Sequence, residues 1–230
     1  MKRYLSLVIL ALFFISCSKD EETSEIDLGY DYFPVKIGHF IEYEVDSIAY
    51  DLEGEHDTSH YYVREIIDSE VIDALKEPAL RIERYKKDSL NHDWDLIDIW
   101  SSKRTSNNAQ RVEEDKRYIR MVFPITGTAQ WDGNALNTED SWSHQYSEIG
   151  SQANYGDLSF QNTVTVLQRE FQSLIDDQYA FEVYAPEIGL IEKYYKVLET
   201  NTDYTIEPIG ENIRGGVEFH FKIMNYGEEE

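Results

Sequence analysis

The sequence predicts a mainly β protein that forms a single antiparallel β-meander domain, half-barrel or barrel-like in shape. Short apolar stretches alternate with polar turns from Tyr32 onward, and no stretch has the periodicity of a long amphipathic helix. Aromatic residues make up 13% of the 230 residues, and burying their rings offsets much of the entropy lost on folding. One domain with a sizeable core is therefore expected.

The expected strands, about nine or ten of them, follow one another with polar turns between them. In residues 41–50, apolar side chains alternate with Glu42 and Glu44, and a bulge at residues 46–47 is expected because the alternation shifts there. The further strands are expected at residues 61–67, 79–85, 93–101, 110–113, 118–123, 160–167, 178–184, 190–198 and 217–224.

A few other elements interrupt this pattern. Short helices are expected at residues 68–76 and 169–175, and residues 131–160 are expected to be a loop rich in aromatic and polar residues. No Pro-rich or Gly/Ser-rich linker and no shift in composition divides the chain. The expected organisation is a lipoprotein signal peptide at 1–16, a lipidated cysteine with an acidic tether at 17–28, and one β-rich domain at 29–230.

The N-terminus explains the one cysteine. Lys2 and Arg3 precede an apolar run of 12 residues, which is shorter than the roughly 20 residues that cross a membrane. The stretch Phe14-Ile15-Ser16-Cys17 resembles a bacterial lipobox, and this resemblance implies that Cys17 carries acyl chains such as palmitate. The alternative is a soluble protein with a buried N-terminal strand and an unreactive thiol.

The next residues refine the expected location. Ser18-Lys19-Asp20-Glu21-Glu22 resembles the export signal that follows the lipidated cysteine in surface-displayed lipoproteins of Bacteroidota-type bacteria. The resemblance implies a protein anchored by lipid in the outer membrane and facing the extracellular side. The alternative is an ordinary hydrophilic linker, because short acidic tethers are common.

Several further segments resemble a family of uncharacterised lipoproteins of Bacteroidota-type bacteria. They are YFPVKIG (32–38), YEVDSI (43–48), VFP (122–124), WDGNALN (131–137), TVTVLQ (163–168) and VYAPEIGLI (183–191). The first and last of them are also similar, more loosely, to secreted β-meander domains that wrap a curved sheet around an apolar concavity. The family has no established activity, so the resemblance implies a fold and a location only.

Composition and motifs exclude several classes of protein. A formal net charge of −24 argues against nucleic acid, whose phosphates attract Lys and Arg. One cysteine excludes a disulfide framework and a zinc site with several thiolates. The chain has neither a Gly-rich phosphate loop nor a Gly-x-Ser-x-Gly elbow, and among 45 acidic residues a pair of carboxylates indicates nothing about glycoside hydrolysis. No cofactor and no enzymatic activity are expected.

The aromatic residues of the middle third are the candidate ligand contacts. Trp94, Trp100, Trp131, Trp142 and Tyr146 gather in the middle third of the chain, where residues 131–160 are poor in aliphatic residues. Aromatic loops on a rigid sheet are a common way to bind sugars, peptides or protein partners. The alternative is that these side chains cap the core.

Two groups of residues suggest metal sites, and both are weak candidates. Asp132, Asn134 and Asn137 supply oxygen side chains, but they lack the 1, 3, 5 and 12 spacing of a calcium loop and suit a turn capped by its own side chains. His56 and His60 stand four apart, yet the turn residues around them favour a solvated loop over a zinc-binding helix. No metal is expected.

The expected function is therefore binding or scaffolding without catalysis. The expected partners are the membrane, through the lipid, and an unidentified protein, glycan or hydrophobic ligand. A carrier that holds a hydrophobic or acyl ligand in a half-barrel is the alternative, and it requires an apolar groove open to solvent. A hydrolase is the least favoured class, because it requires ionisable groups with perturbed pKa values that converge in a pocket.

Overall fold

The computed structural model describes residues 27–51, 55–200 and 213–229. The predicted signal peptide, the acylated Cys17 and the export signal at residues 18–22 lie outside these ranges. In the described part of the chain, no helix is long and apolar enough to cross a membrane.

Twelve strands and one short 3-10 helix make up the described fold, and no described residue is α-helical. They are η2 (Tyr30–Tyr32), β1 (His39–Tyr50), β2 (His56–Ile72), β3 (Pro78–Lys87), β4 (Asp95–Arg104), β5 (Asn108–Glu113), β6 (Lys116–Val122), β7 (Gln130–Asp132), β8 (Ser143–Tyr155), β9 (Leu158–Gln172), β10 (Asp176–Ala185), β11 (Gly189–Thr200) and β12 (Ile213–Glu228).

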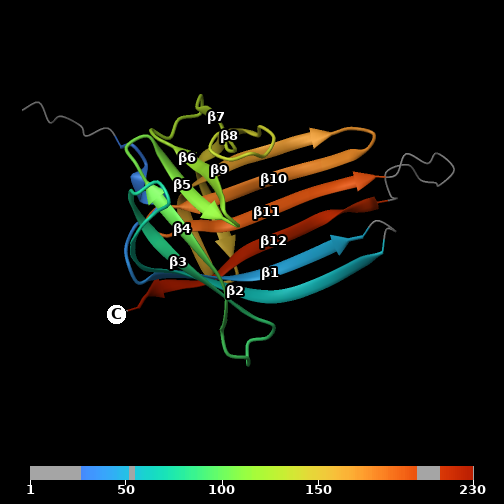
Figure 1. Cartoon of the computed structure of the whole chain (residues 1–230), viewed down its shortest axis with the longest axis horizontal. Helices are drawn as coiled ribbons and strands as arrows, with labels where there is room; N and C mark the ends of the chain where they lie inside the picture. The colour runs from blue at the N-terminus through green and yellow to red at the C-terminus, as the bar shows by residue number, and fades with distance from the viewer. Residues whose placement is uncertain (1–26, 52–54, 201–212, 230) are drawn as a thin grey trace, which may run out of the picture.

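All twelve strands belong to one antiparallel sheet, which curls into a nearly closed barrel (Figure 1). The strand order is β6-β5-β4-β3-β2-β1-β12-β11-β10-β9-β8-β7, so consecutive strands pair, except for β6 and β7, and β1 pairs with β12. Only β6 and β7 are left as edges. The prediction of a single, mainly β, antiparallel meander is confirmed.

Side chains close the seam between β6 and β7. One backbone bond crosses it, from Ile119 N–H to the carbonyl of Gly133 at 2.9 Å. The Trp131 Nε1–H donates to the carbonyl of Ile119 at 3.0 Å. The Tyr146 hydroxyl donates to the Val122 carbonyl at 2.6 Å and accepts from the Val122 N–H at 2.9 Å. These bonds satisfy edge groups that would otherwise remain open to pairing with another chain.

The expected loop at residues 131–160 is wrong over most of its length. β8 occupies residues 143–155, and β9 begins at Leu158. β8 is rich in small and polar residues and has few β-branched ones, so its sequence lacks the usual strand signal. Its pairing with β9 is also irregular, with register shifts on both sides of Ser151.

Both expected helices are also wrong. β2 continues to Ile72, and the turn that follows is capped by Asp73, whose Oδ1 accepts from the N–H groups of Leu75 and Glu77 at 2.9 and 3.0 Å. Residues 169–172 belong to β9. Ile72 and Leu75 are exposed, so no apolar helix face finds a partner, and an isolated helix this short is marginal.

The expected bulge at residues 46–47 is wrong in position. β1 pairs with β2 without interruption from Phe40 to Tyr50, and its register shift lies between Glu42 and Tyr43, opposite β12. The shift in alternation after Val45 arises because Ile48 lies on the outer face beyond the core, opposite Glu218.

The N-terminal segment covers one side of the apolar core. Phe33 is buried with Tyr43 and Leu190 in the main core cluster. The Arg104 Nη1 atom donates to the carbonyls of Tyr30 and Phe33 at 2.6 and 2.8 Å, which ties the 3-10 turn to β4. The remaining volume inside the barrel is lined by polar, charged and aromatic side chains, and it holds the candidate site.

Replacing Tyr146 by Phe tests the closure of the seam. Tyr146→Phe leaves the Val122 N–H and carbonyl without their partner, so we expect the free energy of unfolding to fall by about 1–3 kcal/mol in urea titrations. Tyr226→Phe, at an exposed position, is the matched control and should change it by less than about 0.5 kcal/mol. Equal effects of the two changes would contradict a role of the hydroxyl in the seam.

Candidate functional site

A cavity of about 400 Å³ inside the barrel is the best candidate for a binding site. Its volume lies within the usual range for small-molecule sites. Strands β5, β6, β8, β9, β11 and β12 and the β7–β8 connection contribute to it. The lining residues are Glu113, Tyr118, Arg120, Asn134, Glu139, Asp140, Trp142, His144, Gln168, Lys193, Tyr195, Val197 and Phe219.

Stacked aromatic rings form one part of the lining. Tyr195 and Phe219 are direct cross-strand partners on β11 and β12, and their rings stack with centroids 4.9 Å apart and planes 9° apart. Trp142 stacks on Tyr195 at 5.8 Å and 20°. The guanidinium of Arg169 lies 5.5 Å from the Trp142 ring centre. Together the stacked rings make this part of the lining apolar and aromatic.

Four buried charges form a closed ring beside this surface. Arg120 lies 2.6 Å from Glu113 and 3.3 Å from Glu182, and Lys193 lies 3.8 Å from Glu113 and 3.5 Å from Glu182. The side chains are at most 15% exposed. Each charge therefore has two opposite charges as neighbours, which is what makes burial of all four tolerable. We call these four residues the charge ring.

The charge ring keeps its carboxylates ionised. Burial alone would raise the pKa of Glu113, but attraction to Arg120 and Lys193 outweighs burial and holds the pKa at about 2. Burial would likewise raise the pKa of Glu182, but the attraction of Arg120 and Lys193 outweighs it and lowers the pKa. Carboxylates with such low pKa values are poor proton donors and poor bases near neutral pH. The ring is therefore suited to holding charge in place.

Buried polar atoms of the cavity have capacity for further hydrogen bonds. Among the described residues, four buried side-chain nitrogen or oxygen atoms have no hydrogen-bond partner in the protein, and three of them belong to Arg120, His144 and Gln168, which line this cavity. Burial lowers the pKa of His144 to about 4, so its ring is neutral at pH 7. Buried polar groups nearly always have a partner, so these three atoms are exceptions in the wall of the cavity.

Gly133 positions His144. A Cβ atom at Gly133 would lie 2.1 Å from the His144 Cε1 atom, so the imidazole occupies the space that any larger residue would need. The ring of Trp131 meets the same imidazole edge to face at 5.6 Å. The Gly133 carbonyl also accepts the seam bond from Ile119, which links the position of His144 to barrel closure.

The predicted ligand-contact aromatics fall into two separate places. Trp142 lines the cavity, and Trp131 and Tyr146 pack against each other beside it at 4.9 Å. Trp94 and Trp100 lie elsewhere: Trp94 is 4.2 Å from the Lys87 ammonium, and Trp100 is 3.7 Å from the Arg84 guanidinium.

Sequence reasoning did not identify the charged residues of the cavity. Alternation along β11 places Lys193, Tyr195 and Val197 on one face. A lysine on a face that otherwise carries apolar and aromatic residues is the one sign in the sequence that a charge points into the barrel. Glu113 and Arg120 belong to the short strands β5 and β6, in which charged and apolar residues are mixed and no face is clearly apolar. Their proximity to Glu182 depends on barrel closure.

The weak metal candidates serve as turn caps and strand residues. The Asp132 Oδ1 atom accepts from the N–H groups of Asn134 and Trp142 at 2.9 and 3.1 Å, and Asn137 donates to the Arg117 carbonyl at 3.0 Å. The described ranges contain no group of three or more His, Cys, Asp or Glu residues that could hold a metal ion.

The two histidines of the second metal candidate lie on a strand. His56 is the first residue of β2, and His60 lies further along it, so the expected loop around them is wrong. Antiparallel pairing places His60 opposite Asp46, and the two side chains are 2.9 Å apart.

No model of a known protein family, no curated protein and no solved structure matches the chain. The family resemblance described above therefore stays a prediction, and the function has to be argued from the cavity itself.

Replacing Gly133 by Ala tests the packing against His144. Because the added methyl group would overlap the imidazole, we expect Gly133→Ala to lower the free energy of unfolding by about 1–3 kcal/mol. Gly127→Ala is the matched control, since a Cβ there meets nothing within 4 Å, and it should be nearly neutral. In a His144→Ala background the cost of Gly133→Ala should largely disappear, and an undiminished cost would contradict the proposed overlap.

Proposed function

We propose that the protein binds a small carbohydrate in the barrel cavity, without catalysis. The observation that carries this proposal is one cavity in which the aromatic side chains of Trp142, Tyr195 and Phe219 lie beside polar side chains that can donate and accept hydrogen bonds. Flat apolar surface and a few placed polar groups are the general features of small-molecule sites.

The chemistry of a pyranose ring fits this combination. One face of the ring carries C–H groups that can lie on an indole, while the rim carries hydroxyls that both donate and accept hydrogen bonds. Asn134, Gln168 and His144 supply neutral donors and acceptors, and Glu139 and Asp140 supply acceptors.

Two other functions receive less support from the same cavity. An acyl chain would place hydrocarbon against the charged side chains of the lining, among them Glu113, Arg120 and Lys193, which costs free energy. Hydrolysis by acid–base catalysis would require a carboxyl group with a pKa near neutrality, whereas the pKa of Glu113 is about 2. A non-enzymatic binding protein is the simpler interpretation.

The location is a second part of the proposal, and it rests on the sequence. The lipobox-like stretch that ends at Cys17 and the acidic segment at residues 18–22 support a lipid-anchored outer-membrane protein that faces the extracellular side. A tether of this kind would hold the barrel away from the membrane, with its cavity accessible to soluble ligands.

Binding is tested by screening the purified full chain against mono-, di- and oligosaccharides and measuring affinities by calorimetry. Trp142→Leu should weaken binding by at least about tenfold, because the ligand loses its stacking surface. Trp94→Leu is the matched control, in the β3–β4 connection near Lys87 and outside the cavity, and should leave the affinity nearly unchanged. Binding of fatty acids but of no saccharide would overturn the proposal in favour of a carrier.

The anchor is tested by replacing Cys17 with Ala in a bacterial host that processes lipoproteins. Because the acyl chains would be lost, we expect Cys17→Ala to move the protein from the membrane fraction to the soluble fraction. Protease added to intact cells should digest the wild-type protein together with a known surface marker. Unchanged fractionation would refute lipidation, and survival while the marker is digested would refute surface display.

A further inference from the structure

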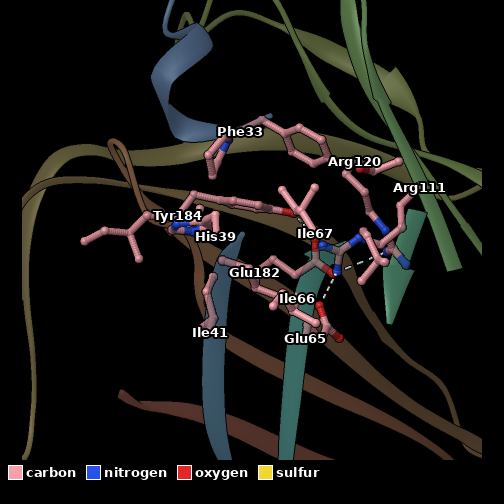
Figure 2. A pocket seen from close by; sticks show the side chains of 16 residues that line it. Phe33, His39, Ile41, Glu65, Ile66, Ile67, Arg111, Arg120, Glu182 and Tyr184 are labelled. Carbon is pink, nitrogen blue, oxygen red and sulfur yellow. Dashed lines mark hydrogen bonds and ion pairs between the residues drawn. The ribbon is translucent and has the colours of Figure 1, made fainter. Parts of the chain in front are cut away.

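A second, smaller cavity inside the barrel is neutral and has little room. It measures about 40 Å³ and borders Arg120, which leaves space for a few water molecules, since one water needs about 10–15 Å³. Figure 2 shows Glu65 and Glu182 beside Arg111 and Arg120, so the two carboxylates and the two guanidinium groups of its lining balance one another. A stronger candidate for a further site lies at the surface of the sheet, along β4.

β4 lies inside the sheet by strand order, but half of it is uncovered on the side of β5. β3 pairs with β4 from Asp95 to Ser102, whereas β5 pairs with residues 101–104 alone. β5 then ends, and the chain reverses into β6 through Glu114 and Asp115, both of which have positive φ. Among the described residues, no strand therefore covers the side of residues 95–100 that faces away from β3.

The backbone of Ile99 faces this open side. Where β4 turns into β5, the N–H of Thr105 donates to the carbonyl of Asn108 at 2.8 Å. Hydrogen-bonding positions recur at every second residue of an antiparallel strand, so the N–H and carbonyl of Ile99 point the same way as those of Thr105. No strand lies opposite Ile99, and its N–H is bonded instead to the Asp98 Oδ1 atom at 2.7 Å. Such an edge can accept a further strand.

Exposed aliphatic side chains follow the same edge. The register with β3 shifts at Ile97, and this bulge leaves Leu96 and Ile99 on the same face of β4. Leu96 is 50% exposed and Ile99 is 51% exposed. Folded proteins usually avoid large apolar side chains on an unpaired strand edge, unless a partner covers them.

A groove of about 350 Å³ lies beside the open edge. Ile99 and Trp100 of β4 line it together with Ile72, which is 69% exposed at the end of β2. The Trp100 Nε1–H donates to the Asp98 Oδ2 atom at 2.6 Å and so holds this carboxylate at the groove. Trp100, one of the predicted ligand-contact aromatics, therefore belongs to a second possible binding surface.

The groove carries a surplus of negative charge. Four carboxylates line it against one guanidinium, and they belong to Asp73, Asp98, Glu114 and Asp115. The guanidinium is that of Arg81, which already contacts the carboxylates of Asp68 and Glu83. Asp73 is paired with Arg117 at 2.8 Å, whereas the other three carboxylates of the lining form no ion pair with any described residue.

Two of these carboxylates lie close to each other. A hydrogen bond shared with Asp98, together with the like charge of that group, raises the pKa of Glu114. The positive charge of Arg84 acts on both carboxylates, but Arg84 is itself paired with Glu65 at 3.0 Å. A cation placed between Asp98 and Glu114 would relieve their repulsion.

We propose that the open edge of β4 at residues 95–100 and the acidic groove beside it are a docking site for an extended, basic segment of another protein. The segment adds to the sheet as a strand, and one of its carbonyls replaces Asp98 at the Ile99 N–H. Its apolar side chains cover Leu96 and Ile99. Its lysines or arginines face Glu114 and the released Asp98.

A second copy of this chain does not suit the same edge. Antiparallel pairing of two β4 edges would bring Asp95 and Asp98 of one copy close to those of the other, and like charges on paired strands are destabilising. Each copy would also carry a formal net charge of −24. The site shares no lining residue with the larger cavity, so it does not depend on which ligand that cavity binds.

A capped peptide of about eight alternating lysine and valine residues tests the site, with the full chain as its partner. It should bind and slow the hydrogen exchange of the Ile99 backbone amide, measured by NMR, because the new strand covers that N–H. The corresponding peptide of glutamate and valine should not bind. Absence of binding, equal binding of both peptides, or binding with unchanged exchange at Ile99 would overturn the proposal. A dimer of the chain alone with a protected Ile99 amide would overturn it in favour of a second copy.

Two pairs of variants separate this site from general attraction between a cationic peptide and an acidic protein. Glu114→Lys should weaken binding by about tenfold, because the new ammonium group pairs with Asp98. Asp157→Lys makes the same change in charge at the β8–β9 turn and should weaken it by less than about twofold. Ile99→Thr should weaken binding by about fivefold, whereas Ile149→Thr, at an exposed position of β8, should leave it nearly unchanged. Equal losses within either pair would contradict the proposed site.

Discussion

The charge ring of Glu113, Arg120, Glu182 and Lys193 is the constraint on which the rest of the barrel depends. It joins β5 and β6 to β10 and β11, two pairs of strands that are not neighbours in the sheet. Removing four charges from water is costly unless each keeps opposite charges close by. The barrel must therefore curl until these strands face one another, and the seam between β6 and β7 can then be closed by short-range bonds.

The ring also explains why the interior is divided. Hydrophobic side chains such as Tyr43, Val45 and Ile191 fill one part of the barrel interior. The charge ring lies in the other part. Arg120 borders an open space on each side. The larger space is also bordered by stacked rings, and the smaller one by Glu65, Glu182 and Arg111.

Prediction from the sequence succeeded where the signal was local. Alternation in residues 41–45 identified β1, because every second side chain faces the apolar interior. The strand expected at residues 190–198 also lies within β11. Prediction failed at β8, whose stability comes from pairing with β9 and from the inward His144 and Tyr146 rather than from strand propensity. The candidate site was found in part, through Trp142, while Trp94 and Trp100 lie apart from it.

The class of fold is readable from the sequence: antiparallel strands in chain order, with a core rich in aromatic residues. Which charges meet is a property of the folded sheet, because Arg120 and Glu182 are 62 positions apart and come together when the sheet curls. Periodicity along one strand specifies which side chains face inward, but it carries no information about the strand across the interior. The aromatic wall, the charge ring and both cavities are products of that closure.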